Sequence, residues 1–179
     1  MNNHAAADAA LFEGAVSCEL MARISIREGP LPPGSTEQAE RLLRDLATME
    51  ERRVEPEDAH HPADPGLRRL EAKIDLTLQL LLQALPHLSP AYGVPTMLSV
   101  RGLRVEGLVS KVVDSETATL SWQPSDTLPL SIHLPLRRLA TEAERSWWAF
   151  DALDPALNDA LERHVFRLHR RWLAAQRRA

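Results

Sequence analysis

Apolar residues recur along the chain with two periods, which divide it into helical and extended segments. From Ala15 to Ile26 apolar and polar side chains alternate, as is typical of a strand. Segments 36–53 and 67–85 instead carry apolar residues at a three-four spacing, which predicts two helices. Charged residues stop after Asp75, so the C-terminal half of the second helix is apolar on nearly all sides and needs burial from several directions.

After Pro90 the period changes to two, in short segments that predict a small antiparallel barrel. Pro129 and Pro135 lie in one of these segments and predict that it is an edge strand or a bulged strand. The expected strands are 96–100, 103–111, 118–122, 128–136 and 145–150.

A final helix is expected from about Asp154 to Arg177. Asp154 is a good N-cap, and Pro155 fits the first helical position. The predicted fold class is α+β, a small antiparallel barrel with heptad-patterned N-terminal helices and a C-terminal helix. Three regions follow from this reading: a loose arm with an extended segment, two helices for oligomerisation, and the barrel with its closing helix. Their expected ranges are 1–34, with residues 1–14 loose, 35–88 and 89–179.

Composition narrows the class of protein. The chain has 179 residues, a net charge of -4 and 44% hydrophobic residues, which is ordinary for a folded domain and gives no reason to expect nucleic acid. The basic end of the last helix suits the helix dipole, although contact with nucleic acid or acidic lipid is an alternative. The one cysteine cannot form an internal disulfide, and no signal peptide or membrane-spanning run is apparent, so we expect a cytoplasmic protein.

Candidate chemistry is sparse. His60 and His61 lie in a Pro-rich linker, and His164 and His169 are five residues apart, so they do not share a helix face well and no metal site is expected. The sequence contains no Gly-x-Ser-x-Gly turn and no Gly-rich phosphate loop, and Cys18 has no basic neighbourhood. We therefore expect neither an enzyme nor a cofactor.

The segment from Met97 to Leu103 resembles the PilZ motif Asp/Asn-x-Ser-x-x-Gly, with Ser99 and Gly102 in place and Met97 where the family has an acid or amide. The run 148–165 resembles the last strand and closing helix of PilZ domains. Residues 71–76 resemble the long helix of the atypical, tetrameric PilZ group of xanthomonads. The resemblance covers about residues 67–179 and is carried mainly by the order of these elements.

The resemblance implies regulation by cyclic di-GMP, which the family holds with an Arg-x-x-x-Arg motif ahead of the barrel and with the Asp/Asn-x-Ser-x-x-Gly turn. No arginine lies between Pro86 and Met97, and the Met97 side chain cannot read a guanine edge. We therefore expect weak or absent binding of cyclic di-GMP. The alternative is a receptor that uses a non-standard or intersubunit set of arginines, for which the candidates are Arg101, Arg104, Arg137 and Arg138.

Ser99 and Gly102 also have a purely structural interpretation, in which Gly supplies an unusual backbone angle and Ser bonds the backbone. Trp147 and Trp148 are adjacent on a strand and point to opposite faces. One is expected in the core, and the other at a partner surface or under the closing helix.

The heptads predict self-association, with a homotetramer favoured by the resemblance and an intramolecular hairpin of the two helices as the alternative. Thr77 at a seam position is a candidate for setting the register. The expected function is a non-enzymatic adaptor for an unidentified protein partner, and the resemblance links it to motility, pili or virulence. The predicted oligomerisation residues are Leu42, Leu46, Met49, Leu67, Leu70, Ile74, Thr77, Leu78, Leu81 and Leu85.

Overall fold

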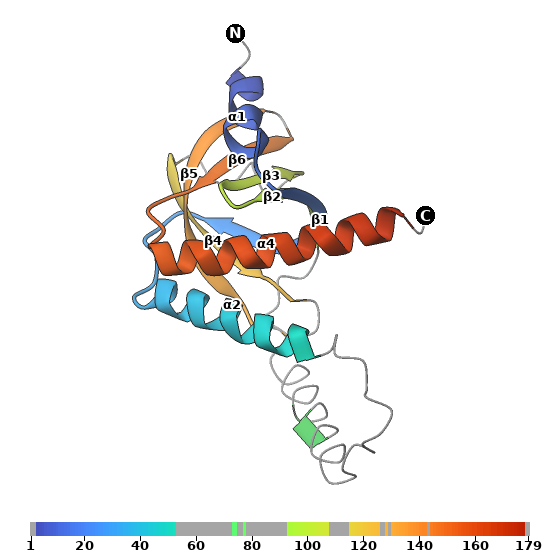
Figure 1. Cartoon of the computed structure of the whole chain (residues 1–179). Helices are drawn as coiled ribbons and strands as arrows, with labels where there is room; N and C mark the ends of the chain where they lie inside the picture. Colours follow the sequence, from blue (N-terminus) through green and yellow to red (C-terminus); the bar gives the residue numbers. More distant parts are fainter. Residues whose placement is uncertain are drawn as a thin grey trace.

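The computed structural model describes residues 3–52, 73–74, 77, 93–107, 115–125, 128, 130–142 and 144–177. Within these ranges six strands form a closed antiparallel barrel in the order β1-β2-β3-β6-β5-β4. Figure 1 shows α1 against one side of this barrel and α4 and α2 together on the other. The elements are α1 Asn3–Phe12, β1 Ser17–Arg27, α2 Ser35–Arg52, β2 Val94–Ser99, β3 Gly102–Glu106, β4 Thr117–Gln123, β5 Ile132–Glu142, β6 Arg145–Phe150 and α4 Pro155–Gln176.

The barrel interior and one face of α4 form a single hydrophobic core. The alternating residues of β1 point inward, as the period of two predicts, and its inward side chains are buried with those of the other strands. Asp154 precedes α4 and its Oδ1 accepts a hydrogen bond from the Leu157 backbone N at 2.8 Å, so the expected N-cap is confirmed. The α4 residues in this core are Leu157, Ala160, Leu161 and Val165.

α2 is confirmed as a helix, but most of its apolar stripe is used within the chain. It packs against α4 and β5, and Leu43 and Leu46 are buried there. Leu46 therefore does not lie on an open seam, which corrects the expectation for that residue. Leu42 is half-buried against the same core, whereas Met49 is exposed.

The expectation of a loose arm over residues 1–14 is wrong from Asn3 onward. Residues Asn3–Phe12 form α1, which packs on β3, β5 and β6, and Ala7 and Leu11 are buried in a second, smaller core. The segment is rich in alanine, a strong helix former, but has no long apolar stripe that would have predicted a docked helix. β1 is confirmed as a strand, and it lies in the same barrel as the later strands, between β2 and β4.

β5 differs from its prediction in its first residue and in its place in the order of strands. It begins at Ile132 rather than at residue 128 and lies between β4 and β6 of a closed barrel, so the edge interpretation is wrong. The strand has a register shift between Arg138 and Ala140, which lies beyond the predicted segment 128–136, so the bulge predicted from its prolines stays a prediction. Pro135 has no N–H to donate, but its carbonyl accepts from the Asp151 backbone N at 3.0 Å.

The predicted helix 67–85 falls outside the described residues except for Lys73, Ile74 and Thr77. Thr77 Oγ1 donates to the Lys73 carbonyl at 2.8 Å, one helical turn back. The Ile74 side chain is 51% exposed, which is high for a large apolar residue.

Candidate functional site: the motif face of the barrel

The Ser-x-x-Gly motif forms the tight turn between β2 and β3, where Ser99 pairs with Gly102. Ser99 is fully buried, and its Oγ accepts from the Arg101 backbone N at 3.1 Å. The same hydroxyl donates to the Leu11 carbonyl of α1 at 2.8 Å. The motif serine therefore shapes its own turn and also holds the end of α1.

Gly102 allows β3, β6 and α1 to approach one another closely. It pairs with Ala149, and a Cβ at this position would clash with the Trp148 carbonyl oxygen, lie 2.8 Å from the Ala149 Cα and lie 2.9 Å from the Leu11 Cδ2. Any larger residue here would push the backbones apart. In this chain the motif glycine is thus required by packing.

Two of the four candidate arginines contact α1. Arg101 Nη1 donates to the carbonyls of Ala10 at 3.3 Å and Glu13 at 3.1 Å, and so caps the C-terminal end of the helix. Arg104 Nη1 lies 3.1 Å from Asp8 Oδ1, and its guanidinium lies over the Phe12 ring at 5.9 Å. Both guanidinium groups are therefore occupied by contacts within the chain.

The other two candidate arginines lie on β5, separated from β3 by β6. Arg137 is exposed and lies 3.9 Å from Asp151 Oδ1. Arg138 pairs with Trp148 on β6, and its backbone N donates to the Glu116 carbonyl at 2.8 Å. The fold therefore brings Arg101 and Arg104 to the motif and places Arg137 and Arg138 on another strand.

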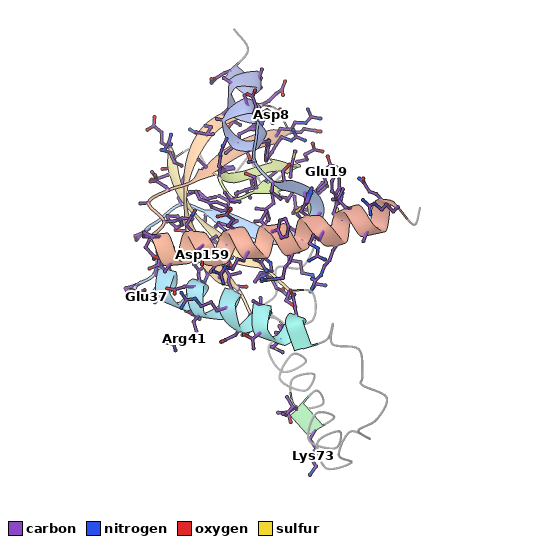
Figure 2. The ribbon with its side chains drawn as sticks, viewed as in Figure 1. Asp8, Glu19, Glu37, Arg41, Lys73 and Asp159 are labelled. Carbon is purple, nitrogen blue, oxygen red and sulfur yellow. The ribbon has the colours of Figure 1, made fainter. Side chains whose placement is uncertain are left out.

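One row of cross-strand neighbours connects the motif strands. Glu19 on β1 is paired with Met97 on β2, Met97 with Arg104 on β3, and Arg104 with Trp147 on β6. The Arg104 and Trp147 end of this row lies under α1. Figure 2 labels Asp8 on α1 and Glu19 on β1, the acidic residues near its two ends.

At the Glu19 end the barrel wall and the α4 C-terminal region border an open groove of about 410 Å³. Met97, where the PilZ motif has an acid or amide, lies half-buried in this groove and presents a thioether. The residues lining the groove are Glu19, Leu20, Met21, Pro95, Thr96, Met97, Arg104, Glu106 and Trp172.

Trp147 and Trp148 do point to opposite faces, as expected from their adjacency. Trp148 lies in the main core, and Trp147 lies in the second core under α1 rather than under the closing helix. Trp147 Nε1 donates to Asp8 Oδ1 at 2.7 Å, and the His4 ring stacks on the indole with centroids 5.1 Å apart. Sequence reasoning missed Asp8 and His4 because only the docking of α1 gives them their partners.

A second polar cluster joins α2 to α4. The Glu50 carboxylate lies 3.0 Å from Arg167 Nε and 2.9 Å from Arg171 Nη2. His164 is buried beside it, packs edge-on against Trp122 and accepts from Arg167 Nη2 at 3.3 Å. Burial, helped by the positive charge of Arg167, lowers the pKa of His164 to about 4, so the ring is neutral at pH 7.

The described residues carry little other reactive chemistry. Burial raises the pKa of the Cys18 thiol to about 11, so it stays protonated at neutral pH. No group of three His, Cys, Asp or Glu side chains among the residues described could hold a metal ion. Nor does any helix in the described part of the chain have the length and hydropathy to cross a membrane. His60 and His61 lie outside the described residues.

The closed antiparallel barrel, its Ser-x-x-Gly turn and its closing C-terminal helix define a PilZ-type domain. Residues 43–178 match the profile of the atypical PilZ domain (tPilZ), a family described as a cyclic di-GMP receptor. The match spans more than half of the chain, so the chain belongs to the atypical PilZ family.

The structure is also similar to that of a pathogenic protein from Xanthomonas campestris, described as a tetrameric PilZ domain self-assembled via an unusual helical bundle. The two share 35% identity over 97% of this chain and 98% of the other, with a TM-score of 0.76. No curated protein matches this chain in sequence.

Proposed function

We propose that this protein is a non-enzymatic, cytoplasmic PilZ adaptor that assembles into a homotetramer and binds cyclic di-GMP weakly or not at all while α1 is docked. The observation that carries the ligand part is the engagement of the motif by α1. Ser99 and Arg101 donate to α1 carbonyls, and Arg104 pairs with Asp8. A nucleotide would have to displace these contacts before it could use the same donors.

The assembly part rests on two supports. The Xanthomonas campestris protein, similar over nearly the whole length, is described as tetrameric. In this chain, segment 67–85 carries an apolar surface wider than one helix can cover, and Ile74 is half-exposed in the single chain. A tetramer would display four barrels and raise the effective concentration of each toward a multivalent partner.

Two measurements test this function. Light scattering coupled to size-exclusion chromatography should give four times the chain mass of 20.0 kDa. Calorimetric titration of cyclic di-GMP into the full-length protein should give no saturable heat at high micromolar ligand. A monomer would contradict the assembly, and a tight isotherm would contradict the ligand part.

A second candidate function is that of a genuine cyclic di-GMP receptor, because the family is described in those terms. The arrangement that favours it is the position of Arg101 and Arg104 beside the motif turn. A saturable isotherm that disappears in an Arg101→Ala/Arg104→Ala variant would support this function. If that variant still gives a saturable isotherm, Arg137 and Arg138 would be the next residues to mutate.

In either case the biological setting is bacterial signalling linked to cyclic di-GMP, such as motility, pili or virulence. This setting follows from membership of the family and not from a group in the site. The protein partner would be found among bacterial proteins that co-purify with the tetramer and are lost when the tetramer is broken.

A further inference from the structure

Among the described residues, the barrel side chains that hydrogen-bond to α1 all act as donors. These donors are the Ser99 hydroxyl, the Arg101 and Arg104 guanidinium groups and the Trp147 indole N–H. α1 supplies only acceptors to them: the carbonyls of its C-terminal end and the carboxylate of Asp8. The seat of α1, which these four side chains form, therefore presents donors to oxygen atoms; two of them are guanidinium groups, and Glu106 Oε1 lies 3.8 Å from Arg104 Nη2.

The seat also receives a flat ring. The His4 imidazole stacks on Trp147 with a centroid separation of 5.1 Å and an interplanar angle of 27°. α1 thus presents together a flat heteroaromatic ring, an anion and a set of carbonyl oxygens. A guanine nucleotide presents a flat heteroaromatic ring, an anionic phosphate and one carbonyl oxygen, and guanidinium groups and indoles bind such groups by bidentate pairing and by stacking.

We propose that α1 is an intramolecular pseudo-ligand: it occupies a site on β3 and β6 that accepts an anionic purine nucleotide once α1 is displaced. In the docked state α1 occupies the hydrogen-bond donors of this site, so the nucleotide cannot bind to them. Release of α1 exposes Arg101, Arg104 and Trp147 together. This inference rests on the proposed function, since it explains why the docked protein binds nucleotide weakly or not at all.

Two features make α1 suited to release. It has ten residues, without an acidic residue in its first turn or a basic one in its last, and isolated helices shorter than about 12–15 residues are marginal in water. Its C-terminal carbonyls are capped by Arg101 and Ser99 of the barrel, so the helix loses these caps when it leaves. Docking and helix formation are therefore coupled.

The connection to the barrel and the neighbouring groove are also suited to exchange. Residues 13–16 link α1 to β1, and Gly14 in this link has a φ of 68° with open space around it. The link can change direction without moving β1. The open groove of about 410 Å³, which Glu19 and Glu106 also line, shares Arg104 with the seat.

The experiment compares three full-length proteins: wild type, Leu11→Asp and Ala9→Asp. Leu11 is buried in the seat, so a charge there expels α1, whereas Ala9 is exposed on the same helix and its variant is the matched control. Hydrogen exchange of the α1 and barrel amides reports release and folding. Cyclic di-GMP is the probe, titrated by calorimetry.

We expect Leu11→Asp to bind cyclic di-GMP at least about tenfold more tightly than wild type, because the apparent affinity scales with the fraction of molecules whose site is open. Ala9→Asp should match wild type. Adding Arg104→Ala to Leu11→Asp should remove the gain. If exchange shows that Leu11→Asp keeps α1 docked or disturbs the barrel, Asp8→Ala takes its place, since it deletes the anion without adding a buried charge.

Free exchange of the α1 amides with protected barrel amides and no gain in affinity would overturn the inference. So would a gain that survives Arg104→Ala, because the ligand would then bind elsewhere. The ratio of variant to wild-type affinity tests the pseudo-ligand. The wild-type isotherm and the mass of the assembly test the proposed function, so the two failures can be told apart.

Discussion

The indole Nε1 of Trp147 donates a hydrogen bond of 2.7 Å to Oδ1 of Asp8, a residue 139 positions earlier in the chain. The same oxygen lies 3.1 Å from Arg104 Nη1, so one carboxylate joins cross-strand neighbours on β3 and β6 to α1. Through this contact α1 covers an aromatic residue that would otherwise lie exposed on the barrel wall.

Replacing Asp8 with Ala should lower the free energy of unfolding by about 1–2 kcal/mol, because the buried indole N–H and the half-buried Arg104 both lose an acceptor. Chemical denaturation followed by tryptophan emission measures the change. Asp159→Ala is the control: Asp159 pairs with Arg163 at 3.1 Å on the exposed face of α4, and such pairs contribute less than about 0.5 kcal/mol. Equal losses in the two variants would contradict the role of Asp8.

Gly102→Ala should destabilise the protein by about 3 kcal/mol or more, because the new methyl group meets the Trp148 carbonyl, the Ala149 backbone and Leu11. Gly107→Ala is the matched control, since Gly107 also has a positive φ, of 104°, but nothing lies within 4 Å of a Cβ there. The Gly107→Ala variant should lose about 1–3 kcal/mol of stability to backbone strain alone, less than Gly102→Ala. Thermal unfolding of both variants decides whether packing or backbone angle determines the need for glycine.

Protein stability should fall as the pH drops from about 6.5 toward about 4, in part because of His164. The pKa of this residue is lowered from 6.5 to about 4 in the folded chain, so in this window the unfolded chain binds a proton that the folded chain does not. The loss should reach up to about 3 kcal/mol at the acid end and then level off.

The His164→Leu variant isolates this contribution from that of the carboxylates. The difference between its unfolding free energy and that of wild type should change with pH across the window and be constant above it. A difference that stays constant from pH 7 to pH 4 would show that His164 does not carry this dependence.

Glu50→Gln should cost about 2–4 kcal/mol, because it leaves Arg167 without a charged partner in a site where both side chains are mostly buried. Glu40→Gln provides the comparison within the same helix, since its ion pair with Arg44 at 2.8 Å involves an exposed arginine. A double-mutant cycle of Glu50→Gln with Arg167→Leu should give a coupling of about 1 kcal/mol or more.

Ile74→Asp should break the assembly. Ile74 lies at a predicted heptad position and is half-exposed in the single chain, so a charge there opposes burial between copies. Lys73→Asp is the neighbouring control at an exposed position and should leave the mass unchanged. Light scattering of both proteins checks this, and a tetramer in Ile74→Asp would place the interface elsewhere.

The Thr77→Leu variant tests whether Thr77 sets the register of the same segment in the bundle. If Thr77 sets the register of the bundle, its replacement by Leu should change the number of subunits. The Thr77 hydroxyl bonds to the Lys73 carbonyl of its own helix, so its effect on register would come from shape rather than from a bond between chains. An unchanged mass would remove Thr77 from the residues that specify assembly.

The sequence by itself determined those elements whose signals are local. The N-cap Asp154 and the apolar stripe of α4, the alternation of β1 and the Ser-x-x-Gly turn each involve residues within a few positions of one another, and periodicity encodes which face of an element is buried. The missing arginines ahead of the barrel were likewise visible without a structure.

Only the tertiary structure decided what covers each buried face. Periodicity cannot say that β5 lies between two strands, that Leu46 packs within its own chain, or that α1 docks on Trp147, because each depends on residues far apart in sequence. α1 carries only two buried side chains among its alanines, too weak a pattern to predict docking. α1 docks there because the barrel presents an indole and hydrogen-bond donors that need acceptors. This surface forms only when the six strands that the structure describes close into a barrel.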